Sequence, residues 1–207
     1  MKIRRGIIGL LTVVLIAVTV YGVLGIKKQP QVMDPLNLTV YTAPEQSAAM
    51  ENPNFIKEEY VPVLPEGTNI ALDGKVQASS FADVYTPRKT IDGNVNGVSY
   101  WEGKPDSYPD TLTVDLRASA SISGIRVCLC PLNIWGKRTQ TFALNVSKDG
   151  VNYEEVAAMK QYTFDPDTGN EVILQFDPIE TQYVQLSFTE NSGASGAQVA
   201  EFEIYSK

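Results

Sequence analysis

A short loop near the middle of the chain carries side chains suited to binding a metal ion. Asp92-Gly93-Asn94 is followed by Ser99 and then by two aromatic residues. Ca²⁺ prefers several oxygen ligands from a tight loop, and a carboxylate, a hydroxyl and the intervening carbonyls can supply them. Asp-Gly-Asn is also common turn chemistry, in which glycine allows the sharp bend. On spacing alone a surface turn is the favoured interpretation, and a calcium loop is the alternative.

The residue types exclude several kinds of catalysis. The chain contains no histidine, which removes Ser-His-Asp and Cys-His mechanisms and histidine-ligated zinc. Cys128 and Cys130 are the only cysteines, and side chains two apart on a strand point the same way and are poorly placed to bond each other. We therefore expect free thiols, buried or half-buried.

Acid–base catalysis by paired carboxylates is the remaining kind of enzyme chemistry to consider. Acid–base work needs two carboxylates held at a fixed separation. Several aspartates lie instead in turns, where aspartate is expected for backbone reasons. We therefore expect no enzyme activity from this set, which comprises Asp106, Asp110, Asp165 and Asp167.

The charge distribution bears on the partners. The chain has 207 residues, 43% of them hydrophobic, and a net charge of −7. Residues 1–28 carry five basic and no acidic residues, so the remaining chain has 12 basic and 24 acidic residues, a net charge of −12. Such a body repels phosphate backbones and anionic lipid headgroups. Nucleic acid is not an expected partner, and binding to anionic phospholipids is disfavoured.

The N-terminus predicts a membrane anchor. Residues 6–26 form an uncharged apolar run of 21 residues, about 30 Å as a helix, which matches one bilayer core. A cleaved signal peptide is the alternative, but its apolar region should be only ~7–15 residues long. We expect residues 1–28 to be an uncleaved transmembrane signal anchor at the cell membrane, with the C-terminal part outside. Cleavage of residues 1–25 would instead give a secreted protein.

The segment that follows predicts a stalk. Residues 29–66 contain six of the 12 prolines and no glycine. Such a composition indicates a semi-stiff, partly extended, extracytoplasmic segment, some of which could dock on the domain that follows.

From about Asn69 the sequence predicts an all-β domain. Short alternating runs, for example residues 111–116, 125–130, 142–147 and 183–188, are separated by turn signals, and no stretch beyond the anchor shows a helical period. Many short strands at this spacing indicate a β-sandwich or barrel.

Motifs in this region occur in an order that resembles a known family. The order and residue types are similar to those of discoidin-like domains, the coagulation factor V/VIII C-type superfamily, and especially to bacterial carbohydrate-binding modules of family 32. The resemblance implies a discoidin-like β-sandwich, a jelly roll of the galactose-binding type, over residues 67–207. The motifs are residues 69–75, 78–80, 91–94, 100–101, 112–116, 147–150, 182–186 and 200–205.

The resemblance also changes the interpretation of the Asp92 loop. Family 32 modules hold a structural Ca²⁺ with this loop and a glutamate near the C-terminus, which corresponds to Glu201. The implied ion would link the two chain ends of the sandwich, and Asn96 or Ser99 could fill the last ligand position. The implied ligands are the side chains of Asp92, Ser99 and Glu201 and the carbonyls of Lys89 or Thr90, Asn94 and Ala200.

Loops at one end of such a sandwich are expected to hold a ligand. Sugars are bound by aromatic faces and by charged or amide side chains in a shallow site. Trp135 and Arg138 are the strongest candidates, since the family uses an aromatic residue and an arginine from this region, whereas Trp101 is expected in the core. A histidine that the family often uses is absent, so a galactose-type specificity is not implied. The candidates are Tyr85, Glu102, Tyr108, Asn133, Trp135, Lys137, Arg138 and Asn191.

The sequence therefore predicts a non-catalytic, membrane-anchored extracellular binding module. A glycan or glycoconjugate on a cell surface or in the environment is the expected ligand. The alternative is an adhesion or assembly protein whose discoidin-like loops bind another protein.

Overall fold

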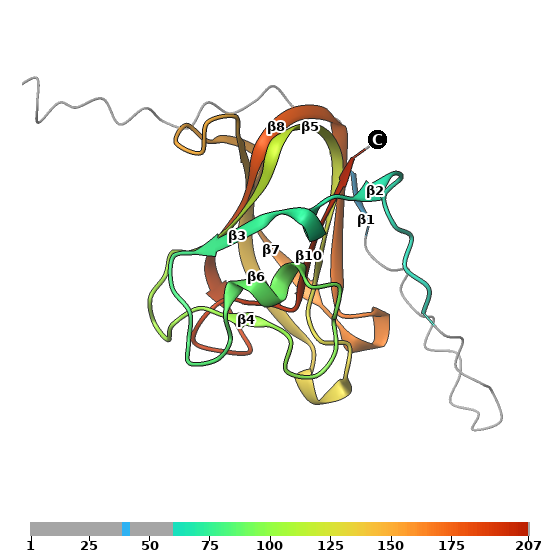
Figure 1. Cartoon of the computed structure of the whole chain (residues 1–207). Coiled ribbons are helices and arrows are strands. Elements are labelled where there is room, and N and C mark those ends of the chain that lie inside the picture. Colours follow the sequence, from blue (N-terminus) through green and yellow to red (C-terminus); the bar gives the residue numbers. More distant parts are fainter. Residues whose placement is uncertain (1–38, 42–59, 207) are drawn as a thin grey trace, which may run out of the picture. The chain divides into compact units, whose positions relative to one another are not determined.

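A computed structural model describes residues 39–41 and 60–206 (Figure 1). The predicted anchor, residues 1–28, and much of the predicted stalk lie outside these residues. In the part of the chain that the structure describes, no helix has the length and apolar character needed to cross a membrane.

The all-β prediction is confirmed. The helical elements among the described residues are four short 3₁₀ turns: η1 (Ala71–Asp73), η2 (Pro87–Ile91), η3 (Asn133–Trp135) and η4 (Pro166–Thr168). The strands are β1 (Thr39–Tyr41), β2 (Thr68–Asn69), β3 (Lys75–Ala78), β4 (Trp101–Glu102), β5 (Asp110–Cys128), β6 (Arg138–Ser147), β7 (Glu154–Phe164), β8 (Glu171–Asn191), β9 (Gln198–Val199) and β10 (Glu201–Ser206).

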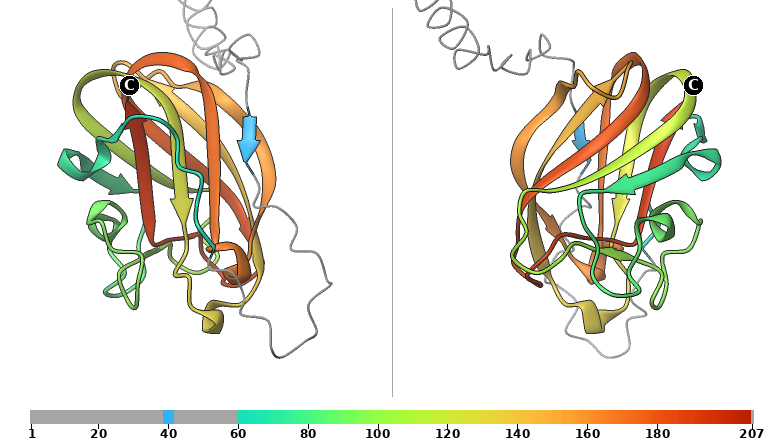
Figure 2. Two further views of the ribbon diagram at one scale, coloured as in Figure 1. Left: turned by 90° about the vertical axis from the view of Figure 1, so that its right-hand side faces the viewer. Right: turned by 60° about the vertical axis from the view of Figure 1, so that its left-hand side comes forward.

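Two long strands, β5 and β8, build both layers of the sandwich. Their paired ladder shifts register between Asp115 and Ala120 and again between Ile122 and Gly124. The strands bend over at this point, as the curved ribbons of Figures 1 and 2 show. The runs at residues 111–116 and 125–130, which the sequence pattern separates, therefore belong to one strand, β5, which ends at Cys128.

The bend defines two layers. In the first, β3 pairs with the beginning of β5, the end of β8 pairs with that part of β5 and with β6, and β7 follows β6. In the second, β2 pairs with β10, β10 with the end of β5, and β1 with the beginning of β8. Because β2 and β10 are neighbours, the first and last strands of the residue 67–206 region meet in one ladder.

Alternation along the strands fills the space between the layers. Leu112 and Val114 of β5 and Leu186 and Phe188 of β8 have no exposed surface, while the residues between them are partly exposed. Full burial of side chains of this size stabilises a fold by about 1.5–3 kcal/mol each. Trp101 lies in the same core, fully buried, with its indole N–H donating to the Ser80 carbonyl at 2.8 Å. The prediction that Trp101 belongs to the core is confirmed.

Part of the predicted stalk packs on the second layer. Thr39 to Tyr41 pair with residues 173–175 of β8. Tyr60 donates a hydrogen bond from its hydroxyl to Glu171 Oε1 at 2.6 Å. Its ring lies over Gly169, where a Cβ atom would sit 2.4 Å from a ring carbon. Residues 60–66, which we call the strap, therefore belong to the surface of the domain.

Both cysteines are free and buried, as the sequence predicted. Burial raises the pKa of the Cys128 thiol well above its ordinary value, although Arg126 nearby opposes this shift. A protonated, enclosed thiol is a poor nucleophile and a poor metal ligand. Cys128 therefore serves the packing of the second layer.

Candidate functional site

Three loops, which contain Tyr85, Tyr100 and residues 135–138, bring four side chains into one cluster. The rings of Tyr85 and Tyr100 stack with centroids 4.3 Å apart and an interplanar angle of 21°. The Trp135 ring meets Tyr100 edge to face, with centroids 4.7 Å apart. The Arg138 guanidinium carbon lies 5.0 Å from the centre of the Trp135 ring. We call these four residues the aromatic cluster.

Polar groups continue from the arginine. Arg138 Nη1 donates to Gln198 Oε1 at 2.7 Å, and Gln198 Nε2 donates to Glu102 Oε2 at 2.8 Å. Asn191 Nδ2 donates to the Gly196 carbonyl at 2.9 Å and lies 3.4 Å from Gln198 Oε1. A guanidinium, two amides and a carboxylate therefore form one hydrogen-bonded row beside the aromatic cluster, and we call it the polar row.

The electrostatics of Arg138 follow from its position. Burial lowers the pKa of the guanidinium, and the nearby Glu102 carboxylate acts in the opposite direction. An arginine remains charged in either case, because its ordinary pKa is above 12. The guanidinium has five N–H donors in total, so it can bind an amide and a ligand at the same time.

Three predicted ligand residues are not brought into this set by any described contact. Lys137 forms an ion pair with Asp165, with Nζ and Oδ2 3.0 Å apart. Asn133 is exposed, and its backbone carbonyl accepts from the Gly136 N–H in η3. Tyr108 packs against the core with its hydroxyl buried, and burial raises the pKa of that hydroxyl to about 12. Tyr85, Glu102, Trp135, Arg138 and Asn191, in contrast, lie together.

Sequence patterns did not predict two members of the site, Tyr100 and Gln198. Tyr100 precedes the buried Trp101, and alternation along a strand places neighbouring side chains on opposite faces, so this signal was available. Gln198 lies opposite Glu102 in the β4–β9 ladder. No local pattern marks such a residue, because its role depends on a partner 96 positions away.

The Asp92 loop also closes on the residue that the resemblance indicated. The Ser99 hydroxyl donates to Asp92 Oδ2 at 2.5 Å, and the Asn94 N–H donates to Asp92 Oδ1 at 2.9 Å. Across the molecule, the Gly93 N–H donates to Glu201 Oε1 at 3.1 Å. Two carboxylates and a hydroxyl therefore meet where the loop touches the start of β10.

Glu201 has an unusual environment. Its exposed fraction is 1%, and its Oε2 is buried without a hydrogen-bond donor among the described residues. Burial, with a contribution from the Asp92 charge, raises the pKa of Glu201 to about 8, although the Gly93 N–H opposes the shift. A buried carboxylate oxygen beside a second carboxylate is a site that a cation would stabilise.

Lys89, Thr90 and Ala200, which were predicted to offer carbonyl ligands, make hydrogen bonds of their own. Lys89 Nζ donates to the Val98 carbonyl at 2.9 Å, the Thr90 hydroxyl donates to Pro87, and the Ala200 N–H donates to Cys128. Within residues 39–41 and 60–206, no three acidic, histidine or cysteine side chains gather to hold a metal. An ion at this position would therefore depend on backbone carbonyls in addition to Asp92 and Glu201.

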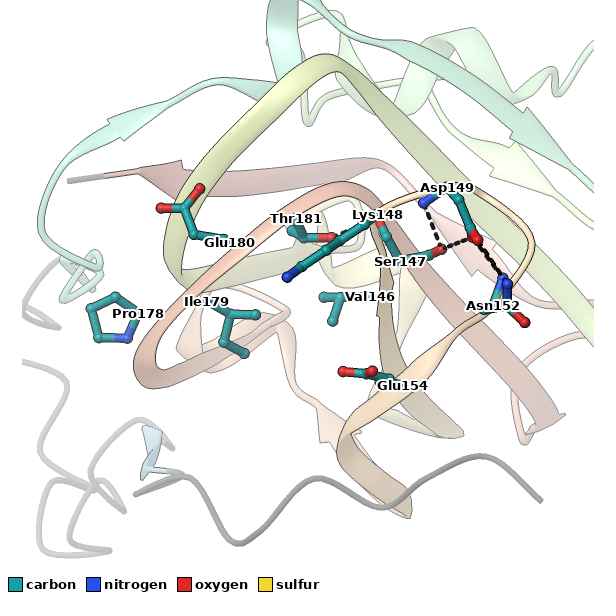
Figure 3. A pocket seen from close by; sticks show the side chains of 10 residues that line it. All are labelled: Val146, Ser147, Lys148, Asp149, Asn152, Glu154, Pro178, Ile179, Glu180 and Thr181. Carbon is teal, nitrogen blue, oxygen red and sulfur yellow. Dashed lines mark hydrogen bonds between the residues drawn. The ribbon is translucent and has the colours of Figure 1, made fainter. Parts of the chain in front are cut away.

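A hollow lined by other residues lacks the chemistry of this site. It has a volume of about 400 Å³ and lies between the β6–β7 turn and residues 178–181 of β8 (Figure 3). Val146 and Ile179 line it together with charged side chains such as Lys148 and Glu154. No aromatic face lines this hollow, so it is a weaker candidate for sugar binding than the aromatic cluster.

Comparison with known proteins identifies the fold. The family model described as the F5/8 type C domain matches residues 75–202. A family 32 carbohydrate-binding module from C. perfringens NanJ, solved with galactose, is 22% identical with a TM-score of 0.55, over 67% of this chain and 98% of that chain. The family 32 module of AlyQ, solved with 4,5-unsaturated mannuronic acid, is 22% identical with a TM-score of 0.52, over 63% and 93%.

A pectin-binding carbohydrate-binding module is 21% identical with a TM-score of 0.53, over 63% of this chain and 88% of that chain. No curated protein matches the chain. At these identities the solved structures establish the fold.

Proposed function

The chain belongs to the F5/8 type C domain family, and from this premise we propose that it is a non-catalytic carbohydrate-binding module. The observation that carries the proposal is the aromatic cluster with its adjoining polar row. Sugars present C–H faces that stack on aromatic rings and hydroxyls that hydrogen-bond to charged and amide side chains. Trp135 and Tyr100 supply the rings, and Arg138, Gln198 and Glu102 supply the donors and acceptors.

The relatives support this proposal in fold and in ligand class. The modules from NanJ and AlyQ were solved with galactose and with an unsaturated mannuronic acid. The charge of the present site is mixed, since Arg138 and Glu102 are joined through one amide. A ligand with neighbouring hydroxyls could accept from the guanidinium and donate to the carboxylate.

We also propose that the protein is anchored in a membrane by residues 6–26, with the domain outside. The support is the length of this uncharged run and the basic residues in front of it. In that arrangement the module would hold a cell to a polysaccharide or to a glycoconjugate.

A structural Ca²⁺ fits the residues that meet at the Asp92 loop. The support is the buried Glu201 Oε2, which has no donor among the described residues, and its neighbour Asp92. The hydrogen bond between Ser99 and Asp92 favours Ser99 over Asn96 as the hydroxyl or amide ligand. When bound, Ca²⁺ would offset the charges of the two carboxylates with oxygen ligands from both chain ends of the domain.

A glycan array probed with the full chain, in Ca²⁺ and in excess chelator, tests the function. Trp135→Ala should abolish binding without changing the melting temperature by more than a few degrees. Leu132→Ala is the matched control, since Leu132 lies on the same loop and is 52% exposed, and the variant keeps the hydrogen bond that the Leu132 carbonyl accepts from the Trp135 N–H at 2.9 Å. Binding that survives Trp135→Ala would show that the site lies elsewhere.

Binding to another protein is the second candidate function. Its specific support is an apolar rim on the same loops: Ile134 is 89% exposed, Val98 69% and Leu132 52%. Exposed apolar groups of this kind gather at protein interfaces. An empty array together with capture of cell-surface proteins, lost in Ile134→Asp, would favour this function over carbohydrate binding.

A further inference from the structure

The two-residue ladder of β4 and β9 connects the Asp92 loop to the polar row. Trp101 pairs with Val199, and Glu102 pairs with Gln198. Glu102 and Gln198 are members of the polar row. Immediately beyond the other end of the same ladder, Ser99 lies two residues before Trp101, and Glu201 lies two residues after Val199.

The ladder is held firmly, so a displacement at one end is transmitted to the other. Trp101 and Val199 have no exposed surface, and interiors are too closely packed to absorb small shifts. Backbone hydrogen bonds continue the ladder on its far side, from the Gly103 N–H to the Ala197 carbonyl at 2.9 Å. Glu102 is also fixed to the Tyr85 loop, where its N–H donates to the Tyr85 carbonyl at 3.2 Å.

A second connection runs through Lys89. Its Nζ donates to the Val98 carbonyl inside the Asp92 loop and lies 5.5 Å from the centre of the Tyr85 ring. Tyr85 stacks on Tyr100, which is the residue after Ser99. The loop is therefore joined to the aromatic cluster through Lys89 and through the chain from Ser99 to Tyr100.

On the basis of the function proposed above, we propose that Ca²⁺ at the Asp92 loop and carbohydrate at the aromatic cluster bind cooperatively, through the β4–β9 ladder. With the ion bound, Ser99 and Glu201 are held together and Tyr100, Glu102 and Gln198 are set in place. Without it, Glu201 Oε2 has no donor among the described residues, and no ion joins Glu201 to Ser99. Tyr100, which follows Ser99, and Glu102, two positions further on, are then held less firmly.

Cooperativity of this kind changes the affinity at each site by the same factor. Coupled sites in proteins typically change one another's affinity about 5- to 150-fold. We therefore expect excess chelator to weaken binding to the array glycans at least about 5-fold, and a bound glycan to raise the affinity for Ca²⁺ equally. A merely stabilising ion would raise the melting temperature and leave both affinities unchanged.

The metal alone supplies a readout that needs no carbohydrate. Trp101 and Trp135 are the only tryptophans, and Trp135→Phe leaves only the buried Trp101. Titration of the full chain with Ca²⁺ should change acrylamide quenching of the fluorescence, and Trp135→Phe should remove that change. A Ca²⁺ response that stays the same in Trp135→Phe would refute transmission to the cluster.

Ser99→Ala and Ser119→Ala form a matched pair for the carbohydrate arm. Ser99→Ala removes a proposed ligand outside the cluster, so it should weaken array binding as chelator does, and Ca²⁺ should not restore it. Ser119→Ala removes an exposed hydroxyl from the bend of β5 and should leave binding unchanged. Equal array affinities in Ca²⁺ and chelator, or no shift of the melting temperature by Ca²⁺, would overturn the coupling. No array binding in saturating Ca²⁺ would refute the carbohydrate function itself.

Discussion

Replacing Glu201 with glutamine should remove a specific pH dependence of stability in the metal-free protein. In chelator the folded state raises the pKa of Glu201 from 4.5 to about 8, mainly through burial. The folded state therefore binds a proton more tightly than the unfolded state does. The contribution of Glu201 to the free energy of unfolding is greatest below about pH 4.5, falls as the pH rises towards 8, and is level above that. The Glu201→Gln variant keeps an acceptor for the Gly93 N–H and has no charge to bury.

The size of the effect follows from the pKa change. One pKa unit corresponds to about 1.4 kcal/mol. Between about pH 5 and pH 7.5 the wild-type protein should lose about 3 kcal/mol relative to Glu201→Gln. For a protein of this size 1 kcal/mol shifts the melting temperature by about 2–4 °C, so the two melting temperatures should diverge by roughly 6–12 °C.

The assay is thermal and urea unfolding of both proteins in excess chelator across this pH range, repeated in Ca²⁺. Comparing the two proteins cancels the titration of all other groups. With Ca²⁺ the wild-type protein should be more stable than Glu201→Gln near neutral pH, because the ion stabilises only the carboxylate form. A difference between wild type and variant that stays constant with pH, to within about 1 kcal/mol, would refute the assigned environment of Glu201.

Two further substitutions test the packing. Arg126→Met should cost about 3–5 kcal/mol in urea unfolding, because Arg126 pairs with Glu171 at 2.5 Å and Glu203 at 2.9 Å, and the Glu171 side chain is only 2% exposed; a loss below about 1 kcal/mol would contradict this. Gly196→Ala should lower the free energy of unfolding by about 1–3 kcal/mol or more. The added Cβ would lie 2.2 Å from the Gly103 carbonyl oxygen. An unchanged melting temperature would show that the backbone relaxes to remove this contact.

Lys148→Met and Ser195→Ala are the controls for these substitutions. Both residues are exposed. Surface changes of this kind usually alter stability by no more than about 0.5 kcal/mol.

Local patterns predicted the strands and part of the site. Alternation located both halves of β5 and the second half of β8, because one buried face imposes a period of two. Trp101 was expected in the core because it stands where a strand begins. Alternation could not show that the halves join, since a bend between layers depends on how the two strands pair rather than on either sequence. Trp135 and Arg138 were found because an aromatic residue and an arginine close together in a turn-rich loop are themselves a signal.

The contacts that assemble the site are mostly long-range. Lys137 looked like a ligand residue, but its partner Asp165 comes from the turn before η4, which no pattern near Lys137 reveals. Gln198 and Glu102 are 96 positions apart, and Gly93 and Glu201 are 108 apart. Among the sequence arguments, only the family resemblance predicted that Glu201 lies at the Asp92 loop.

The short pairing of β1 with β8 has a mechanical consequence. A pull on the chain from the N-terminal side of β1 reaches three residue pairs before it reaches Tyr60. Three pairs at the edge of a sheet give way under less load than the long ladders of β5 and β8. Under such a pull the β1–β8 pairing therefore opens first, and the β5–β8 ladder that joins the two layers stays intact.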